Sequence, residues 1–126
     1  MKDTLRPGIT NSATYTVTAA MSAPHLPRVV LSTPSMVSLI EGTCLQAVQG
    51  ELDPGETTVG THICVSHQAA ATEGEQFVVR AMLAKVEKRR LTFQVSVEGP
   101  AGVLSEGTHE RAVISLDRAG GRPPQP

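Results

Sequence analysis

The fold is decided by PSMVSLIEGTCLQAV, residues 34–48, in which apolar side chains recur every three or four positions. This spacing is typical of an amphipathic helix that packs one face against a core. Glu41 interrupts the pattern, because it shares a helix face with Val37 and Leu45, four residues to either side. An ionised carboxylate on an apolar face is costly unless it is paired or used, so Glu41 is a candidate functional residue.

The sequence also indicates where this helix starts and stops. Pro34 suits the first helical position, and Thr33 suits the cap before it. Gly50 and the turn at residues 53–55, Asp-Pro-Gly, close the segment. We therefore expect one main helix over residues 34–48.

Strand patterns surround the helix. A first strand, residues 13–18, alternates and is rich in β-forming residues. After the helix, period-2 patterns predict a meander of four antiparallel strands, residues 57–67, 76–87, 90–98 and 103–115. The sheet must wrap the helix to cover its apolar stripe, so the expected class is α+β, with an antiparallel sheet around one main helix.

A second candidate functional residue, His67, closes the run TVGTHICVSH, residues 58–67. Alternation along that run places His67 on the same face as Ile63 and Val65. A helix carboxylate at Glu41 and a strand-end imidazole at His67 are therefore expected to converge.

The remaining histidines and both cysteines receive structural interpretations. His62 faces the opposite side of the strand, and His25 and His109 have no polar partner nearby in the sequence. Cys44 and Cys64 lie in apolar runs, without CxxC spacing or other zinc-ligand intervals, so reduced, buried thiols and no metal site are expected.

Length and composition indicate one domain. The chain of 126 residues is close to the commonest domain size, and we expect residues 1–118 to fold while the tail at 119–126 stays disordered. A formal net charge of -1, with one Tyr, two Phe and no Trp, argues against nucleic-acid binding. No signal-peptide pattern and no run of ~20 apolar residues is present, so no membrane partner and a cytoplasmic location are expected.

Three blocks of sequence carry a family resemblance. They are LSTPSM at 31–36 leading to Glu41, TVGTHICVSHQAAAT at 58–72, and GTHERAVI at 107–114. Together, over about residues 5–116, they resemble the fluoroacetyl-CoA thioesterase-like family of hotdog-fold thioesterases.

The resemblance implies a hotdog fold and an acyl-CoA thioesterase that releases a carboxylic acid and free CoA. Carried over by motif position, it implies that Thr33, Glu41 and His67 are the catalytic residues. Gly60 would line the acyl site, and Arg111 would support it. No cofactor is implied, since CoA belongs to the substrate, and the expected protein partner is a second copy of the chain, in a homodimer or a higher even-numbered homo-oligomer.

The chain departs from the family pattern just before Thr33. Members specialised for fluoroacetyl-CoA carry a longer insert with aromatic lid residues there, whereas this chain has only LPRVVLS, residues 26–32. We therefore expect a generic acyl-CoA thioesterase that lacks the aromatic lid and its selectivity for a fluorinated acyl group.

Each candidate residue also has a structural interpretation. In that interpretation, Thr33 is an ordinary helix cap. Glu41 reaches solvent or pairs with Arg111, whose most ordinary role inside a strand is an ion pair. His67 hydrogen-bonds a backbone carbonyl at the end of its strand. The basic hairpin containing Lys88-Arg89-Arg90 either meets CoA phosphates or forms a solvated face, which is the commoner role.

Several reaction types remain open at this stage. Either Glu41 and His67 activate water for direct attack, or Thr33 attacks first and water clears an acyl-enzyme. A non-catalytic acyl-CoA-binding module would need neither Glu41 nor His67. A hydratase or dehydratase commonly pairs an Asp with a His, whereas the Asp residues here lie in the leader, a turn and the start of the tail.

Helix geometry predicts how a shared site would be assembled. Glu41 lies eight residues after Thr33, which at ~1.5 Å per residue is ~12 Å along a regular helix. This distance is too long for side-chain contact within one subunit, so a site that contains both would be completed by a second subunit. A single sheet also leaves strand edges that a two-fold pairing would satisfy.

Overall fold

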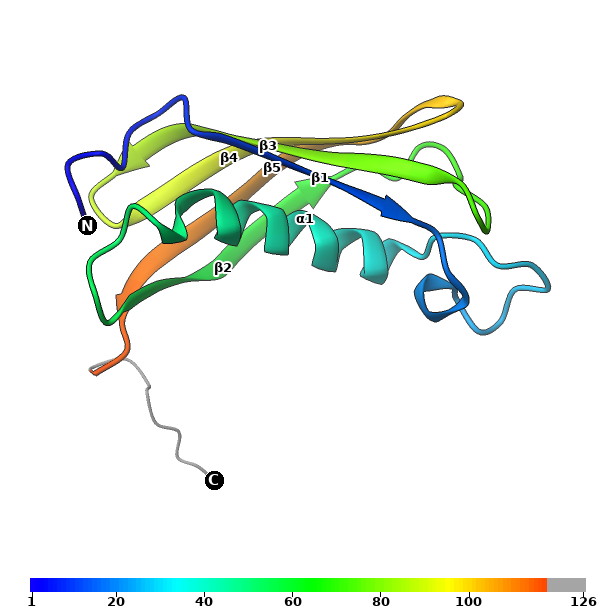
Figure 1. Cartoon of the computed structure of the whole chain (residues 1–126), viewed down its shortest axis with the longest axis horizontal. Coiled ribbons are helices and arrows are strands. Elements are labelled where there is room, and N and C mark those ends of the chain that lie inside the picture. Colours follow the sequence, from blue (N-terminus) through cyan, green and yellow to red (C-terminus); the bar gives the residue numbers. More distant parts are fainter. Residues whose placement is uncertain (118–126) are drawn as a thin grey trace.

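The computed structural model describes residues 1–117, and the tail predicted at 119–126 lies outside them. Its elements follow the predicted order of one strand, one main helix and four strands, so the α+β class is confirmed (Figure 1). No helix in this part of the chain is long and apolar enough to cross a membrane. The elements are β1 (Thr10–Thr16), the short 3-10 turn η1 (Ala19–Met21), α1 (Thr33–Gln49), β2 (Glu56–Val65), β3 (Gln76–Glu87), β4 (Arg90–Gly99) and β5 (Gly102–Ser115).

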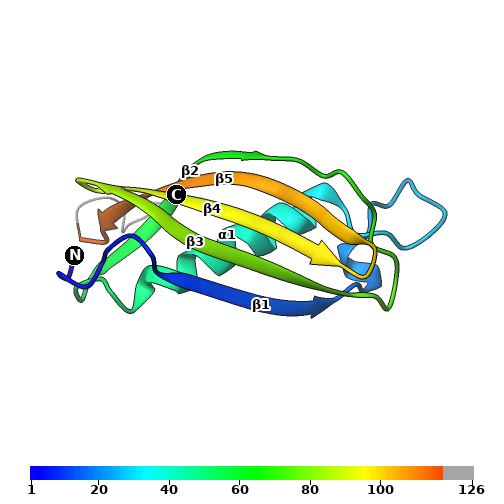
Figure 2. The same ribbon diagram turned by 90° about the horizontal axis from the view of Figure 1, so that it is seen from above.

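All five strands form one antiparallel sheet in the order β1-β3-β4-β5-β2. β3, β4 and β5 are joined by tight hairpins, whereas β1 and β2 occupy the two edges. Figure 2 shows the sheet curled over α1, with β1 and β2 flanking the helix on opposite sides. The predicted wrapping of the helix by the sheet is therefore confirmed. Each edge strand has only one strand neighbour among the described residues.

A stripe of completely buried side chains attaches α1 to the sheet. The stripe consists of Met36, Ile40, Cys44 and Val48, spaced four residues apart. These side chains pack against the inner face of the sheet, where alternate residues of β3 and β4 are buried. Burying one aliphatic side chain contributes about 1.5–3 kcal/mol, so the stripe is a major source of the stability of this packing.

The helix begins one residue earlier than predicted, and its cap is Ser32. The N–H of Ser35 donates to Oγ of Ser32 at 3.2 Å, while Thr33 is already the first helical residue. Ser32 has the extended backbone that a cap requires, with φ -78° and ψ 154°. The prediction that Thr33 is the cap is therefore wrong, and its hydroxyl is free for another role.

Two further expectations are wrong at the edges of the sheet. The first strand runs from Thr10 to Thr16, because this is the segment that pairs with β3. Cys64 is exposed although its apolar neighbours predicted burial, because β2 is an edge strand. Cys44 is buried as expected, and burial raises the pKa of its thiol to about 12.

Candidate active site

Thr33 and His67 meet at the N-terminal end of α1. Oγ1 of Thr33 lies 2.8 Å from Nδ1 of His67, although 34 residues separate them in the sequence. Thr33 belongs to the first turn of α1, and His67 follows the last residue of β2 by two positions. His67 therefore lies beyond the end of β2, beside the first turn of α1.

Backbone hydrogen bonds on both sides hold His67 in this position. The N–H of Ser66 donates to the carbonyl of Glu106 at 3.0 Å. The N–H of Gln68 donates to the carbonyl of Leu104 at 2.8 Å. His67 is therefore fastened to β5 even though it lies outside β2.

Most backbone donors in the first turn of α1 are already used. Ser32 accepts the N–H of Ser35 with its side chain and the N–H of Met36 with its carbonyl. Pro34 has no N–H. Within residues 1–117, Thr33 therefore provides the one first-turn N–H that remains available to an anion.

A hollow of about 520 Å³ opens beside the Thr33 and His67 pair. Most of its lining is apolar, and none of it is Phe, Tyr or Trp. Such a wall suits an acyl chain whose carbonyl lies near the Thr33 hydroxyl. The remaining lining residues are Ala23, His25, Leu26, Val30, Leu31, Ser32, Pro34, Gln68, Ala69 and Ala70.

Glu41 is absent from the residues that line this hollow. Its Oε1 lies 3.8 Å from Nη1 of Arg111, and its side chain is 40% exposed. The deeply buried stripe of α1 runs along the neighbouring positions, so Glu41 lies at its edge with the half-buried Val37 and Leu45. The ion pair with Arg111 is the one that the structural interpretation expected.

Gly60 makes room for this ion pair. A Cβ atom at position 60 would lie 2.9 Å from Oε1 of Glu41, 3.2 Å from Cε1 of His109 and 3.5 Å from Nη1 of Arg111. The first of these distances is shorter than real Cβ contacts. Within one chain, Gly60 therefore borders the carboxylate of Glu41 and does not line the hollow beside Thr33.

Arg111 is held by buried partners. Its Nε donates to Oγ1 of Thr58 at 2.7 Å, and its Nη2 donates to the Thr58 carbonyl at 3.0 Å. Nη1 donates to Nε2 of His109 at 3.1 Å. Burial lowers the pKa of Arg111, and the charge of Glu41 opposes that shift. The guanidinium is thus fixed in one orientation, with Nη1 toward Glu41.

His109 is the residue of this site that sequence analysis missed. It is 1% exposed and has polar partners on both ring nitrogens, although none lies near it in the sequence apart from Arg111. Alternation along β5 was the available signal, since His109, Arg111 and Val113 are all buried on one face. Two polar residues that share a buried face require hydrogen-bond partners, and here they provide them for one another.

The predicted site residues therefore fall into two groups. Thr33 and His67 form the first, while Glu41, Gly60 and Arg111 form the second, and no hydrogen bond or ion pair of the described chain joins the groups. The expected convergence of Glu41 and His67 is wrong for a single chain. Glu41 lies beside the middle of β2, whereas His67 follows the end of that strand.

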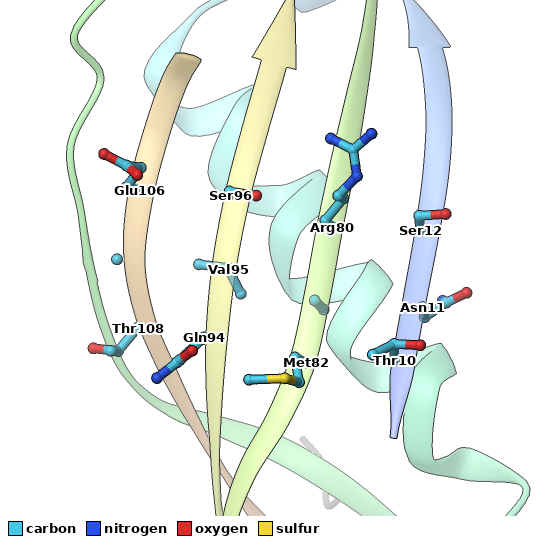
Figure 3. Close-up of a pocket in the computed structure, with 12 residues that line it drawn as sticks. Thr10, Asn11, Ser12, Arg80, Met82, Gln94, Val95, Ser96, Glu106 and Thr108 are labelled. Atoms are coloured by element: carbon cyan, nitrogen blue, oxygen red, sulfur yellow. The ribbon is translucent and has the colours of Figure 1, made fainter. Parts of the chain in front are cut away.

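Two other surface features lie away from both groups. At the β3-β4 hairpin, Nε of Arg89 donates to the Val113 carbonyl at 2.9 Å, and Nη2 pairs with Glu56 at 3.0 Å. This hairpin is at the end of the sheet opposite the first turn of α1 (Figure 1). A broad, mainly polar groove on the outer face of the sheet contains none of the predicted site residues (Figure 3).

Sequence comparison identifies relatives of this chain. The model of the FlK family, described as fluoroacetyl-CoA-specific thioesterase, matches residues 11–117. The fluoroacetyl-CoA thioesterase of Streptantibioticus cattleyicolor is 45% identical over 89 residues, which make up 71% of this chain and 64% of that protein. The match therefore spans just under two thirds of the length of that relative.

Solved structures share the same architecture. The fluoroacetyl-CoA thioesterase FlK matches with a TM-score of 0.85 and 36% identity, over 92% of this chain and 93% of that chain. A variant of FlK in complex with fluoroacetate and CoA matches equally well, with a TM-score of 0.85, 36% identity and coverage of 92% and 100%. A thioesterase superfamily member from Thermus thermophilus has a TM-score of 0.84 at 21% identity, over 92% and 88% of the two chains, and supports the fold alone.

The family match extends over nearly the whole described chain, and the arrangement of one helix within a curled five-stranded sheet agrees with these structures. The predicted hotdog fold is thus confirmed. The protein belongs to the fluoroacetyl-CoA-specific thioesterase family of hotdog-fold proteins.

Proposed function

We propose that the protein is an acyl-CoA thioesterase, which hydrolyses a thioester to a carboxylic acid and free CoA without a cofactor. The observation that carries this proposal is the 2.8 Å contact between the Thr33 hydroxyl and the His67 imidazole, at the edge of the hollow. Family membership supports the substrate class, and a variant of the related FlK was crystallised with fluoroacetate and CoA.

The Thr33 and His67 pair supports a route through an acyl-enzyme. A threonine hydroxyl is a weak nucleophile unless a base accepts its proton, and Nδ1 of His67 lies where that proton would go. Oγ1 of Thr33 attacks the thioester carbonyl, its proton passes to His67, and His67 protonates the CoA sulfur as the C–S bond breaks. The free N–H of Thr33 is available to the oxyanion. Water then hydrolyses the acyl ester and restores the Thr33 hydroxyl.

Glu41 supports a direct route, or the second step of the covalent one. Its carboxylate accepts a proton from water as the water oxygen attacks the carbonyl carbon. In the direct route the C–S bond then breaks, and the proton that Glu41 accepted from water passes by way of His67 to the CoA sulfur, which restores both side chains. The two routes use the same side chains and differ in whether an acyl group is ever attached to Thr33.

Either route needs Glu41 within reach of Thr33 and His67, and we propose that a second subunit provides it in a two-fold homodimer or a larger even-numbered assembly. β2 is an edge strand on which Val59 and Ile63 are 41% and 36% exposed. The second group of site residues, Glu41, Gly60 and Arg111, lies on or beside this same strand. Pairing of two chains through β2 would cover these apolar side chains, satisfy the open backbone groups and bring Glu41 toward the partner's first turn of α1.

Release of free thiol from short, branched, aromatic and long acyl-CoA esters tests the activity. The wild-type protein should hydrolyse at least one ester, and Glu41→Gln and His67→Ala should each lower kcat/KM by about 10² or more. Unchanged turnover in both variants would contradict the site. Binding of the esters without any thiol release would indicate a non-catalytic acyl-CoA-binding module instead.

Mass spectrometry of the acid-quenched protein separates the two routes. The covalent route predicts an acyl group on Thr33 during turnover and its absence in Thr33→Ala. A mild loss of activity in Thr33→Ala, with no acyl-protein in the wild type, would support direct attack by water.

A further inference from the structure

His109 lies in a position that allows only one arrangement of its protons. Nδ1 is 2.8 Å from the carbonyl oxygen of His62, which can only accept a hydrogen bond. Nε2 is 3.1 Å from Nη1 of Arg111, which can only donate one. The imidazole must therefore carry its proton on Nδ1 and keep Nε2 as an acceptor.

Neighbouring elements restrain the ring. The side chain is buried, and the ring stacks on Phe93 of β4 with a centroid separation of 6.4 Å and an interplanar angle of 27°. A Cβ atom at Gly60 would lie 3.2 Å from Cε1 of His109, so β2 also approaches the ring closely. Rotation of the imidazole is restricted, and Nε2 stays directed at Arg111.

Three of the five N–H groups of Arg111 are used by Thr58 and His109, and of the two that these bonds leave, the one on Nη1 lies beside Glu41. Thr58 accepts from Nε and from Nη2, and His109 accepts one N–H of Nη1. The other N–H of Nη1 is left for the carboxylate of Glu41, whose Oε1 is 3.8 Å away. His109 and Thr58 together therefore determine where the positive charge is presented to Glu41.

We propose that His109 is a positioning residue, whose neutral imidazole fixes Nη1 of Arg111 beside Glu41 and so orients the carboxylate that activates water. This inference rests on the proposed function, because Glu41 is the base of that reaction. His109 does not line the hollow beside Thr33, although with Glu41 and Gly60 it lines a second hollow of about 350 Å³. Both of its ring nitrogens are already paired, with the His62 carbonyl and with Arg111, so it acts through Arg111 and not on the substrate.

The surroundings of the ring favour its neutral form. Burial lowers the pKa of His109 and the charge of Arg111 adds to that effect, while the His62 carbonyl and nearby carboxylates oppose it. Protonation of Nε2 would direct an N–H at the guanidinium and break the contact. The charges that act on His109 are those of Arg111, Glu41 and its strand neighbour Glu110, while the His62 carbonyl and the uncharged Phe93 contact its ring.

A double-mutant cycle tests the proposal. His109→Ala should lower kcat by ~10- to 100-fold with little change in KM, because a misplaced base weakens the chemical step more than binding. His109→Gln, whose side-chain carbonyl can accept from Arg111, should recover part of the loss. In a Glu41→Gln background His109→Ala should cause no further loss, because the carboxylate that it positions is gone.

Leu104→Ala is the matched control for loss of stability. Leu104 is a buried residue of the same strand and has no part in the hydrogen bonds of Arg111. Leu104→Ala should change kcat by the same factor in the wild-type protein and in the Glu41→Gln variant. Equal losses from His109→Ala in both backgrounds would overturn the proposal, and His109→Gln carries the same test if His109→Ala does not fold.

Imidazole ¹⁵N NMR of the wild-type protein provides a readout that does not depend on activity. At pH 6.5, the usual pKa of histidine, His109 should show the neutral form protonated on Nδ1. A charged ring, or a proton on Nε2, would overturn the proposal even in an active enzyme. If no acyl-CoA is hydrolysed but the Nδ1–H form is observed, the proposed function fails while the arrangement of His109, Arg111 and Glu41 is supported.

Discussion

At the scale of single residues, the missing side chain at position 60 allows Glu41 to approach Arg111. Gly60→Ala should lower kcat/KM by about 10², because the new Cβ would lie 2.9 Å from Oε1 of Glu41 and must displace it. The fold should survive, since the displaced atom is the end of a flexible, half-exposed side chain. Thiol-release kinetics and thermal unfolding of the same preparation check both statements.

Gly42→Ala is the matched control for this change. Gly42 lies inside α1, and a Cβ there would meet nothing within 4 Å. The substitution should leave turnover unchanged and raise the free energy of unfolding by about 1 kcal/mol, since alanine favours the helix over glycine. Equal activity of the two variants would show that Gly60 has no bearing on the site.

His109 should make stability depend on pH in a defined direction. Its pKa in the folded protein is lowered from 6.5, so the unfolded chain binds more protons between the two values. The stability contributed by the neutral ring is complete above 6.5 and is lost as the pH falls through the lowered pKa. Urea unfolding from about pH 8 to about pH 5 should show this loss in the wild type and a smaller one in His109→Gln. The same slope in both proteins would assign the pH dependence to another group.

At the scale of elements, two neighbouring residues at the start of α1 have different roles: Ser32 caps the helix, whereas we propose that Thr33 takes part in the reaction. Ser32→Ala should lower the free energy of unfolding by about 0.5–2 kcal/mol, because it removes the acceptor for the N–H of Ser35. Thr33→Ala should change that free energy by less than ~0.5 kcal/mol and lower kcat/KM instead. Denaturant unfolding and thiol release on both variants make the comparison, and a larger stability loss for Thr33→Ala would contradict it.

The segment between η1 and α1 forms part of the wall of the hollow beside Thr33, so we expect it to influence acyl selectivity. It places Leu26 and Val30 in the wall of the hollow and offers no Phe or Tyr to cover a small acyl group. Discrimination between fluoroacetyl-CoA and acetyl-CoA should therefore be weak when kcat/KM values are measured side by side. A large preference for the fluorinated ester would show that another part of the hollow selects the substrate.

An added aromatic side chain probes the same wall. Val30→Phe should reduce hydrolysis of the larger esters more than that of acetyl-CoA, because it fills part of the hollow. Arg28→Phe belongs to the same segment without lining the hollow, so it should leave the preference unchanged.

At the scale of the whole molecule, the separation of the two groups of site residues predicts complementation between subunits. Thr33→Ala and Glu41→Gln chains, each impaired alone, should regain about a quarter of wild-type activity when mixed, if subunits exchange at random and each mixed dimer holds one intact site. Light scattering should report a dimer or a larger even-numbered assembly. A fully active monomer would contradict the shared site.

The control mixture combines two changes in the same group. Gly60→Ala and Glu41→Gln both affect the carboxylate that one subunit would provide, so every site in their mixture is defective. Their mixture should therefore stay inactive. Recovery there would mean that the subunits do not divide the site in the proposed way.

Much of the fold followed from local pattern. The four-residue spacing of Met36, Ile40, Cys44 and Val48 depends only on the geometry of a helix, and the alternation along the later strands depends only on the pleat. The same helix geometry showed that Thr33 and Glu41 are too far apart to touch. The sequence blocks around these residues were also enough to identify the family.

Other features depended on tertiary structure, because they arise from pairings between distant segments. Ser32 and Thr33 are both good caps by composition, and the structure shows which of them keeps an extended backbone. The exposure of Cys64 depends on strand order, since only pairing places β2 at an edge. The partners of His109 and the contact between Thr33 and His67 likewise come from segments brought together by the sheet. Periodicity is a local property of the backbone, whereas neighbours across a sheet are set by long-range register, which no single stretch of sequence contains.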